Sequence, residues 1–241
     1  MTVDFSPAFI LHQRPFQETS LLLDVFSRDY GRISLIAKGF RKQKRSQAGL
    51  LQIYQPLLLS WIGRRDLQTL TAAESDGPAY LLHAESALCG LYINELMIKL
   101  LPLGEAESSL FISYQQALLG LQNAEQNEVT LRLFEKQLLS HLGYGLVLDH
   151  DVETGEQINE SEDYYYVADS GLYRWRPGQK QRRISGRSLQ HIIAEQGFDS
   201  TSLNEIKQLM RMVIHFYLGD KPLRSRELFS QLHQASIQQQ Q

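Results

Sequence analysis

The chain has 241 residues, 43% of them hydrophobic and 21% charged, with a formal net charge of −3. This length favours two packed domains, and the composition excludes intrinsic disorder of the whole chain. No apolar run approaches the ~18 residues that span a bilayer, and residues 1–7 lack a signal-peptide pattern, so we expect a cytoplasmic protein. The single cysteine, Cys89, excludes an internal disulfide and a multi-cysteine zinc site.

Charge is unevenly distributed along the chain. Residues 1–80 contain ten Lys or Arg and seven Asp or Glu, residues 81–163 contain three and fourteen, and residues 164–241 contain eleven and six. The three segments therefore carry net charges of +3, −11 and +5. Two basic ends around an acidic middle favour an anionic partner more than the near-neutral total does.

Five short runs of alternating hydrophobicity predict β-structure in the first domain. They cover residues 8–13, 19–26, 32–38, 52–61 and 66–73, and all connections except residues 39–49 are short. Strands with such connections predict a five-stranded barrel over residues 1–78. An OB-fold is the leading candidate, and an SH3-like barrel is the second.

Helical periodicity dominates the second predicted domain, residues 79–241. Helical runs cover residues 88–100, 109–121, 129–142, 188–195, 203–217 and 223–232, and Gly143 is expected to end the third run in a left-handed conformation. Residues 149–183 interrupt this pattern and contain a predicted strand pair at 164–167 and 172–176. The fold class is therefore α+β, an N-terminal barrel followed by a mainly helical domain with a small irregular β insertion.

The sharpest local feature is a basic segment in the predicted loop after the third strand. Five cations lie within eight residues, namely Lys38, Arg41, Lys42, Lys44 and Arg45. Such a loop can follow phosphates while Phe40 stacks on a base, as in single-strand binding surfaces. Arg14, Arg28 and Arg32 would add positive charge, and Tyr54 is a second candidate for stacking. The alternative is a solvated loop whose charge only keeps the protein soluble.

Two further basic groups lie near the C-terminal end. They consist of Arg174, Arg176, Lys180, Arg182, Arg183 and Arg187, and of Lys221, Arg224 and Arg226 at the start of the last helix. Positive charge at a helix N-terminus opposes the helix dipole at a cost of about 0.3–1 kcal/mol per charge. Phosphate binding or a salt bridge to the acidic middle segment could offset this cost, and the sequence favours neither.

Arg132 and Lys136 are rare cations in the acidic middle, four residues apart on one predicted helix face. Next to apolar residues, such a pair could bind a short acidic and hydrophobic peptide. The simpler interpretation is intrahelical pairing with Glu135 and Glu128, and the residues alone favour it.

Signals for catalysis are weak. Asp149 and Asp151 flank His150, but alternate residues of an extended segment do not converge on one metal ion, and no second ligand cluster follows. The sequence has no phosphate-binding P-loop, nucleophile elbow or zinc-protease motif. Cys89 lies on an apolar helix face and is expected to be a core residue. We therefore expect no enzyme activity.

Several segments in matching order resemble the RecO family of bacterial recombination mediators. They are residues 9–12, 14–16, 18–20, 31–32, 37–39, 90–96, 141–145, 217–219 and 221–229. Together they cover nearly the whole chain, which makes the resemblance specific although no single segment is.

The resemblance implies an OB-fold followed by a helical domain, binding to single- and double-stranded DNA, and annealing of complementary strands. It also implies partnership with RecR and the single-strand binding protein SSB in loading the recombinase RecA, and a nucleoid-associated location in the cytoplasm. Arg132, with Lys136, falls where the resemblance implies capture of the acidic SSB tail.

This chain departs from the family at one place. Many members carry a four-cysteine zinc site in the segment that corresponds to residues 149–183, and here that segment has no cysteine. We therefore expect no zinc and no other cofactor. The insertion would then be held by an aromatic cluster of Tyr164, Tyr166, Tyr173 and Trp175.

The preferred hypothesis is a non-enzymatic DNA-binding mediator with no membrane partner. Its predicted DNA-binding residues are Arg14, Arg28, Arg32, Lys38, Phe40, Arg41, Lys42, Lys44, Arg45, Lys221, Arg224 and Arg226. The first alternative is an interaction adaptor that uses an OB-like barrel without binding DNA. The second is a metal-dependent nuclease that uses Asp149 and Asp151.

Overall fold

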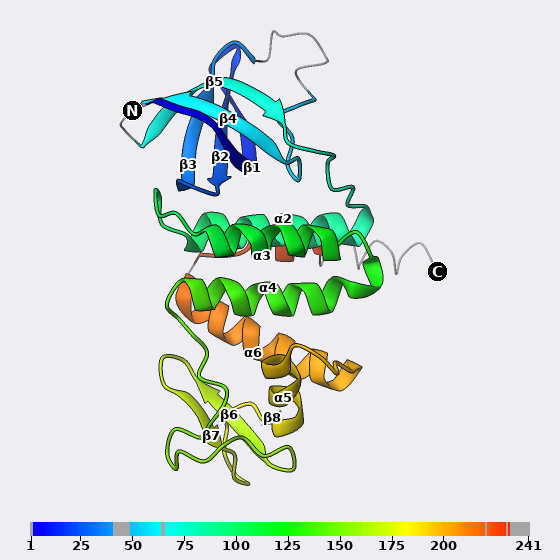
Figure 1. Cartoon of the computed structure of the whole chain (residues 1–241). Helices are drawn as coiled ribbons and strands as arrows, with labels where there is room; N and C mark the ends of the chain where they lie inside the picture. The colour runs from blue at the N-terminus through cyan, green and yellow to red at the C-terminus, as the bar shows by residue number, and fades with distance from the viewer. Residues whose placement is uncertain (1, 41–48, 64–65, 220, 230, 232–241) are drawn as a thin grey trace. The chain divides into compact units, whose positions relative to one another are not determined.

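A computed structural model describes residues 2–40, 49–63, 66–219, 221–229 and 231. The chain divides into two compact units, one made of Met1–Ala124 and Leu223–Gln241, the other of Glu125–Pro222. Figure 1 labels their helices and strands. Among the described helices, none combines the length and the apolar character needed to cross a membrane.

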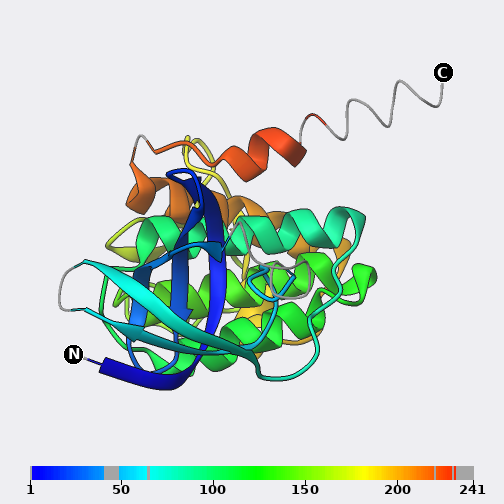
Figure 2. The ribbon, with the colours of Figure 1, turned by 90° about the horizontal axis from the view of Figure 1, so that it is seen from above.

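The first unit contains a closed five-stranded barrel. Its strands are β1 (Thr2–Phe16), β2 (Ser20–Ser27), β3 (Gly31–Ala37), β4 (Leu57–Ile62) and β5 (Leu67–Ser75). They close in the order β1-β2-β3-β5-β4, as the view from above shows (Figure 2). All neighbours are antiparallel except β3 and β5, which run parallel. This arrangement confirms the predicted OB-fold.

The barrel interior follows from the alternation of its strands. Leu23, Val25, Ile33 and Leu35 point inward and are at most 5% exposed. β1 is longer than predicted because it pairs with β4 up to Ala8 and with β2 from Ala8 onward. Register shifts within both pairings let this one strand bend and close the barrel.

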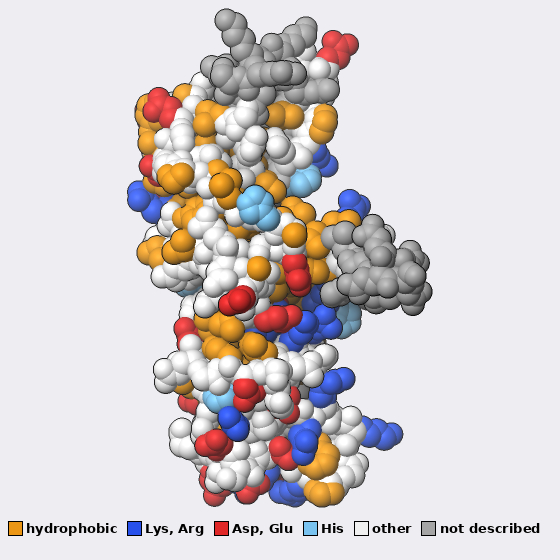
Figure 3. Space-filling view, turned by 90° about the vertical axis from the view of Figure 1, so that its right-hand side faces the viewer, with side chains coloured by type: hydrophobic (Ala, Val, Ile, Leu, Met, Phe, Trp, Pro, Cys, Tyr) orange, Lys and Arg blue, Asp and Glu red, His pale blue; other side chains and the backbone are white. Residues whose placement is uncertain are grey.

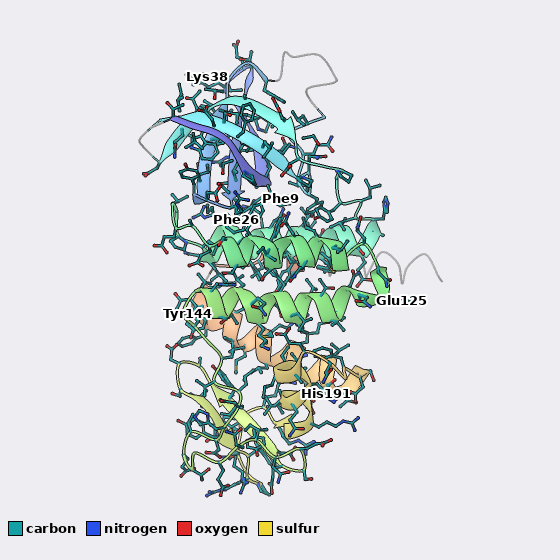
Figure 4. All side chains as sticks on the ribbon, viewed as in Figure 1. Phe9, Phe26, Lys38, Glu125, Tyr144 and His191 are labelled. Atoms are coloured by element: carbon teal, nitrogen blue, oxygen red, sulfur yellow. The ribbon has the colours of Figure 1, made fainter. Side chains whose placement is uncertain are left out.

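Two helices of the first unit, α2 (Ala84–Leu100) and α3 (Ser108–Gly120), pack against the barrel. Phe9 of β1 and Phe26 of β2 point away from the barrel interior and contact Phe111 and Tyr114 of α3, with ring centroids 5.1–6.3 Å apart (Figure 4). Buried Asn94 of α2 donates to the Leu11 carbonyl and accepts from the Tyr114 hydroxyl. These contacts cover part of the outer barrel surface.

The second unit is built on α4 (Asn127–His141), α5 (Gly186–Ala194) and α6 (Ser200–Leu218), with the 3-10 helix η2 (Ala124–Gln126) before α4. α6 packs against both α4 and α5. Asp199 and Ser202 form a capping box at the start of α6. Gly143, at φ 77°, follows α4 in the predicted left-handed conformation.

A small sheet in the second unit replaces the helical pattern over the predicted insertion. Its strands are β6 (Asp163–Val167), β7 (Gly171–Arg174) and β8 (Ile184–Ser185), in the order β7-β6-β8. Tyr164 and Tyr166 point to its buried face, at 1% and 8% exposure. Tyr173 pairs with Tyr165 on the opposite face, so the predicted four-residue aromatic cluster is wrong in placing all its rings together.

Candidate nucleic-acid interface

The outer surface of β1, β2 and β3 carries the candidate interface. Arg14 of β1 lies opposite Leu22 of β2, and Leu22 lies opposite Ile36 of β3, so the three share one face of the sheet. This is the outer face, because Leu23 and Leu35, next to Leu22 and Ile36 along their strands, line the core. Lys38 follows Ile36 by two residues and extends this row. Arg14 and Lys38 are exposed, and neither makes an ion pair within the described part of the chain. Two available cations thus flank Leu22, which is partly exposed, and Ile36, which is buried at 9% exposure.

The next row on the same surface has less net charge. His12 lies opposite Asp24, and His12 Nδ1 is 3.6 Å from Asp24 Oδ2. Beyond this row, Phe9 and Phe26 lie under α3. The helices therefore leave the Arg14 end of the barrel surface exposed and cover the Phe9 end.

Arg32 and Arg28 have partners of their own. Arg32 Nε donates to the carbonyl of Leu101 at the end of α2, over 2.9 Å, and burial lowers the pKa of this arginine. Arg28 Nε lies 2.9 Å from Asp29 Oδ1, and this hydrogen bond lowers the pKa of Asp29. Arg32 thus joins the barrel to α2, and the charge of Arg28 is largely neutralised.

The structure describes only part of the basic segment at residues 38–45. Arg41, Lys42, Lys44 and Arg45 lie outside the described residues. Phe40 is partly buried and packs against the barrel core. Its ring is therefore less available for stacking than the sequence suggests.

Tyr54, the second predicted stacking residue, is not available. It is 7% exposed, and its hydroxyl donates to the Ala87 carbonyl of α2 over 3.1 Å. A Cβ on Gly90 would lie 2.6 Å from that hydroxyl oxygen, so only glycine at this position allows α2 to lie so close to Tyr54. The proposed stacking role of Tyr54 is therefore wrong, because its ring fastens the barrel to α2.

An exposed aromatic ring that the sequence analysis missed is Phe5. It is 46% exposed at the register shift between Val3 and Ser6, with φ 48°, and its N–H donates to Ser60 Oγ. Positive φ is uncommon for a large side chain and is often found at functional sites. No sequence signal marks this bulge, because it depends on pairing with β4.

The last helix of the first unit, residues 224–229, has a carboxylate at its N-terminus. Glu95 of α2 accepts from the N–H groups of Arg224 and Ser225, over 3.0 and 2.9 Å, and from Ser225 Oγ. Burial alone would raise the pKa of Glu95, but these hydrogen bonds and Lys99 lower it. A carboxylate from the acidic middle segment thus offsets the positive charge of Arg224 and Arg226. Arg224 is exposed, and so is Lys221 in the other unit.

Arg132 and Lys136 lie on α4 but are used differently. Arg132 is 3% exposed, and its Nη2 lies 3.1 Å from Glu135 Oε1, while its Nε and Nη1 lack an acceptor within the described residues. Lys136 Nζ donates to the Ile192 and Ile193 carbonyls near the end of α5 and to Glu195. Only Arg132 thus has spare hydrogen-bond donors.

Asp149 and Asp151, the residues of the nuclease alternative, form hydrogen bonds within the chain. Asp151 is 3% exposed and accepts from three backbone N–H groups, those of Glu153 and Thr154 on Oδ1 and that of Arg174 on Oδ2. Asp149 is hydrogen-bonded to His150. Within the described residues, no group of three His, Cys, Asp or Glu could hold a metal ion. Asp151 therefore acts as an anchor that ties the loop before the small sheet to β7.

Comparison with known proteins identifies the family. The family model "Recombination protein O N terminal" matches residues 1–78, and "Recombination protein O C terminal" matches residues 83–227. Proteins called "DNA repair protein RecO" match over nearly their full length. The one from Nitrosococcus oceani is 42% identical over 96% of this chain and 95% of its own, and the one from Coxiella burnetii strain RSA 493 is 43% identical over 94% and 97%. The chain therefore belongs to the RecO family of DNA repair proteins.

Proposed function

We propose that the chain is a non-enzymatic recombination mediator that binds single- and double-stranded DNA and anneals complementary strands. The observation that carries this proposal is the pair of exposed cations Arg14 and Lys38 on the outer barrel surface, which form no ion pair within the described residues; between them Leu22 is partly exposed and Ile36 is buried. Cations beside a partly exposed apolar side chain can hold phosphates while bases lie against that side chain. Family membership independently supports a role in DNA repair.

Binding of this kind has no sequence preference, because phosphates carry no sequence information. Two strands held on positive surfaces have reduced mutual repulsion and can pair without a catalytic residue. If Arg14, Lys38 and the four cations at 41–45 each neutralise one phosphate, the slope of log affinity against log salt concentration is about −4 for single strands. A slope near zero would contradict this electrostatic account.

The variant Arg14→Ala, Lys38→Ala tests the surface directly. We expect weaker binding of a fluorescent single strand and a slope reduced by about 1.4, because two phosphate contacts are lost. The matched control is Arg28→Ala, which removes a cation already paired with Asp29. Equal losses in both variants would show that total charge, rather than this row, determines binding.

We also propose that the acidic SSB tail binds at Arg132. Nε and Nη1 of Arg132 have no acceptor within the described residues and could bind a carboxylate, but both are buried, so a tail reaches them only when neighbouring side chains move. Arg132→Ala should weaken capture of an acidic tail peptide and leave binding of naked DNA unchanged. The comparison variant is Lys136→Ala, because the Lys136 ammonium group already donates a hydrogen bond to the Ile192 carbonyl of α5. Equal loss of peptide and DNA binding in Arg132→Ala would mean that the residue is only structural.

The partnership with RecR and SSB in loading RecA belongs to the same proposal. A strand-annealing assay with and without SSB, followed by addition of RecR and RecA, tests all three partners. Annealing of SSB-coated strands and faster RecA loading are the expected results. A chain that fails to shift a short single strand at moderate salt would instead be an interaction adaptor.

A further inference from the structure

The small sheet of the second unit has an outward face that the proposed function does not use. Tyr165 of β6 lies directly opposite Tyr173 of β7, and their rings are nearly parallel, with centroids 5.4 Å apart and planes at 19°. Trp175 follows Tyr173 by two residues, and its backbone N–H donates to the Asp163 carbonyl of β6, so β7 and β6 remain paired there. All three side chains are partly exposed, although the indole nitrogen of Trp175 is buried.

The inner face of the sheet explains why these rings point outward. Tyr164, Tyr166, Leu172 and Ile184 are at most 8% exposed and fill the opposite face. Because side chains alternate along a strand, the residues between them must face away from that core. The outer rings are therefore not required to bury the inner face.

The segment that follows the rings is strongly basic. Residues 170–187 contain six Lys or Arg and no Asp or Glu. Three of them are paired within the second unit, namely Arg174 with Glu156 and Glu162, Arg183 with Asp163, and Arg187 with Glu160 and Asp199. Cations and carboxylates are accordingly mixed over the small sheet and its loops at the bottom of Figure 3.

The other three cations are Arg176, Lys180 and Arg182. They are exposed, and none of the three forms an ion pair within the described residues. They lie in the connection between β7 and β8, and Arg183 at the end of this connection reaches Asp163 of β6. The unpaired charges therefore belong to the loop that begins at Trp175.

Rings side by side on adjacent strands, with unpaired cations in the next loop, suit a chain of stacked bases joined by phosphates. Bases stack on aromatic rings without regard to sequence, and the cations neutralise the backbone. A base pair in a duplex has its faces covered by its neighbours, so a duplex fits this surface poorly. We propose that this face of the small sheet is a second binding site for single-stranded nucleic acid. The proposal rests on the DNA binding proposed above and assigns it an additional surface.

Tryptophan fluorescence of the full chain can report on this site. The sequence has two tryptophans, and Trp61 is 1% exposed in the barrel core. Addition of oligo-dT should therefore quench Trp175, and the quenching should disappear in Trp175→Phe. A duplex of the same length should quench much less. Unchanged Trp175 fluorescence, while anisotropy shows that the oligonucleotide is bound, would overturn the second site and leave the barrel site intact. No binding by either measurement would overturn both.

Variants of the rings give a second test. Tyr165→Ala, Tyr173→Ala should weaken oligo-dT binding at this site by about thirtyfold or more, since two base–ring stacks are lost. Tyr165→Phe, Tyr173→Phe should retain the affinity, because it keeps both rings. The matched control is Tyr144→Ala, which removes a 39% exposed ring stacked on Tyr217 elsewhere in the second unit. Retained affinity in the double alanine variant would refute stacking. If that variant does not fold, photocrosslinking of iodouracil-containing strands to the unmodified chain replaces it, and absence of crosslinks at Tyr165, Tyr173 and Trp175 is the negative result.

Variants of the cations separate nucleic acid from an acidic protein partner. Arg176→Ala, Lys180→Ala, Arg182→Ala should reduce the salt slope for oligo-dT by about 2. Arg187→Ala, which removes a paired cation, should change it little. Polyglutamate serves as the competing probe. Quenching of Trp175 by polyglutamate but not by oligo-dT would mean that this face binds an acidic protein segment, and it would overturn the proposal.

Discussion

Asp151 should be the main anchor of the loop before the small sheet, and Asp151→Ala tests this. The substitution removes the acceptor of three backbone N–H groups, at 2.8, 3.2 and 2.8 Å. A hydrogen bond to a charged group contributes about 1.5–3 kcal/mol. The N–H groups of Glu153 and Thr154 can turn to water, whereas that of Arg174 lies in β7. We therefore expect the unfolding free energy of the second unit to fall by about 3 kcal/mol.

The assay is urea unfolding followed by Trp175 fluorescence, in a chain with Trp61→Phe so that Trp175 is the only tryptophan. Asp151→Asn keeps one acceptor oxygen and should lose about half as much free energy as Asp151→Ala. The control is Asp149→Ala, whose exposed carboxylate is hydrogen-bonded to the neighbouring His150. A change below about 0.5 kcal/mol in Asp151→Ala would refute the anchor, since ordinary surface substitutions cost that little.

The same carboxylate makes stability depend on pH. Burial alone would raise the pKa of Asp151, but the N–H groups of Glu153, Arg174 and Thr154 lower it below its ordinary value. A lowered pKa adds stability that is fully present above the unfolded-state pKa of about 3.9 and is lost as the pH falls through the folded value. The free-energy difference between the unmodified chain and Asp151→Asn should therefore be constant above about pH 5 and narrow below pH 4. A difference independent of pH would argue against the charged acceptor.

Three further predictions concern the first unit. Asn94→Ala leaves the Leu11 carbonyl and the Tyr114 hydroxyl without their partner, so we expect a loss of about 3 kcal/mol in thermal or urea unfolding, and an unchanged midpoint would exclude the role. Gly31→Ala would place a Cβ 1.8 Å from the Glu105 carbonyl oxygen at φ 64°, so we expect a strongly destabilised variant, and unchanged stability would contradict this close approach. Glu95→Gln should speed amide exchange over residues 224–229 about fivefold, because a charged cap contributes about 1 kcal/mol, and unchanged exchange would show that Glu95 is dispensable.

The barrel was predictable from the sequence because its inward residues alternate without interruption along β2 and β3. The full length of β1 was not, since its register shifts break the alternation and its two halves pair with different strands. β8 has two residues, which is too short to show any period. Local periodicity thus identifies elements, but bends and short strands depend on contacts distant in sequence.

The candidate site was less predictable for the same reason. Phe9 and Arg14 both lie on outward positions of one strand, and the sequence does not tell which is covered by α3. The sequence suggests Phe40 and Tyr54 as residues that stack on bases, yet Tyr54 is buried against α2 and Phe40 packs on the barrel core. Exposure of an aromatic residue depends on what packs over it, and neither composition nor spacing contains that information.

The net charges of the three sequence segments predict an anionic binding partner. The structure adds which of the cations already form ion pairs within the chain. A cation that already has a carboxylate must break that contact to bind a phosphate. For an exposed pair this costs only about 0–1 kcal/mol, but the carboxylate that stays beside the cation repels the phosphate. Arg28, Arg174, Arg183, Arg187 and Lys207 all have such partners. Within the described residues, exposed cations without an ion pair are Arg14 and Lys38 on the barrel, Arg176, Lys180 and Arg182 beside the small sheet, and Arg211, Lys221 and Arg224 on or before helices. In the first two groups they adjoin apolar or aromatic side chains on the outer face of a sheet. Unpaired charge beside such a face, rather than net charge along the sequence, is therefore the better indicator of where this chain holds a nucleic-acid strand.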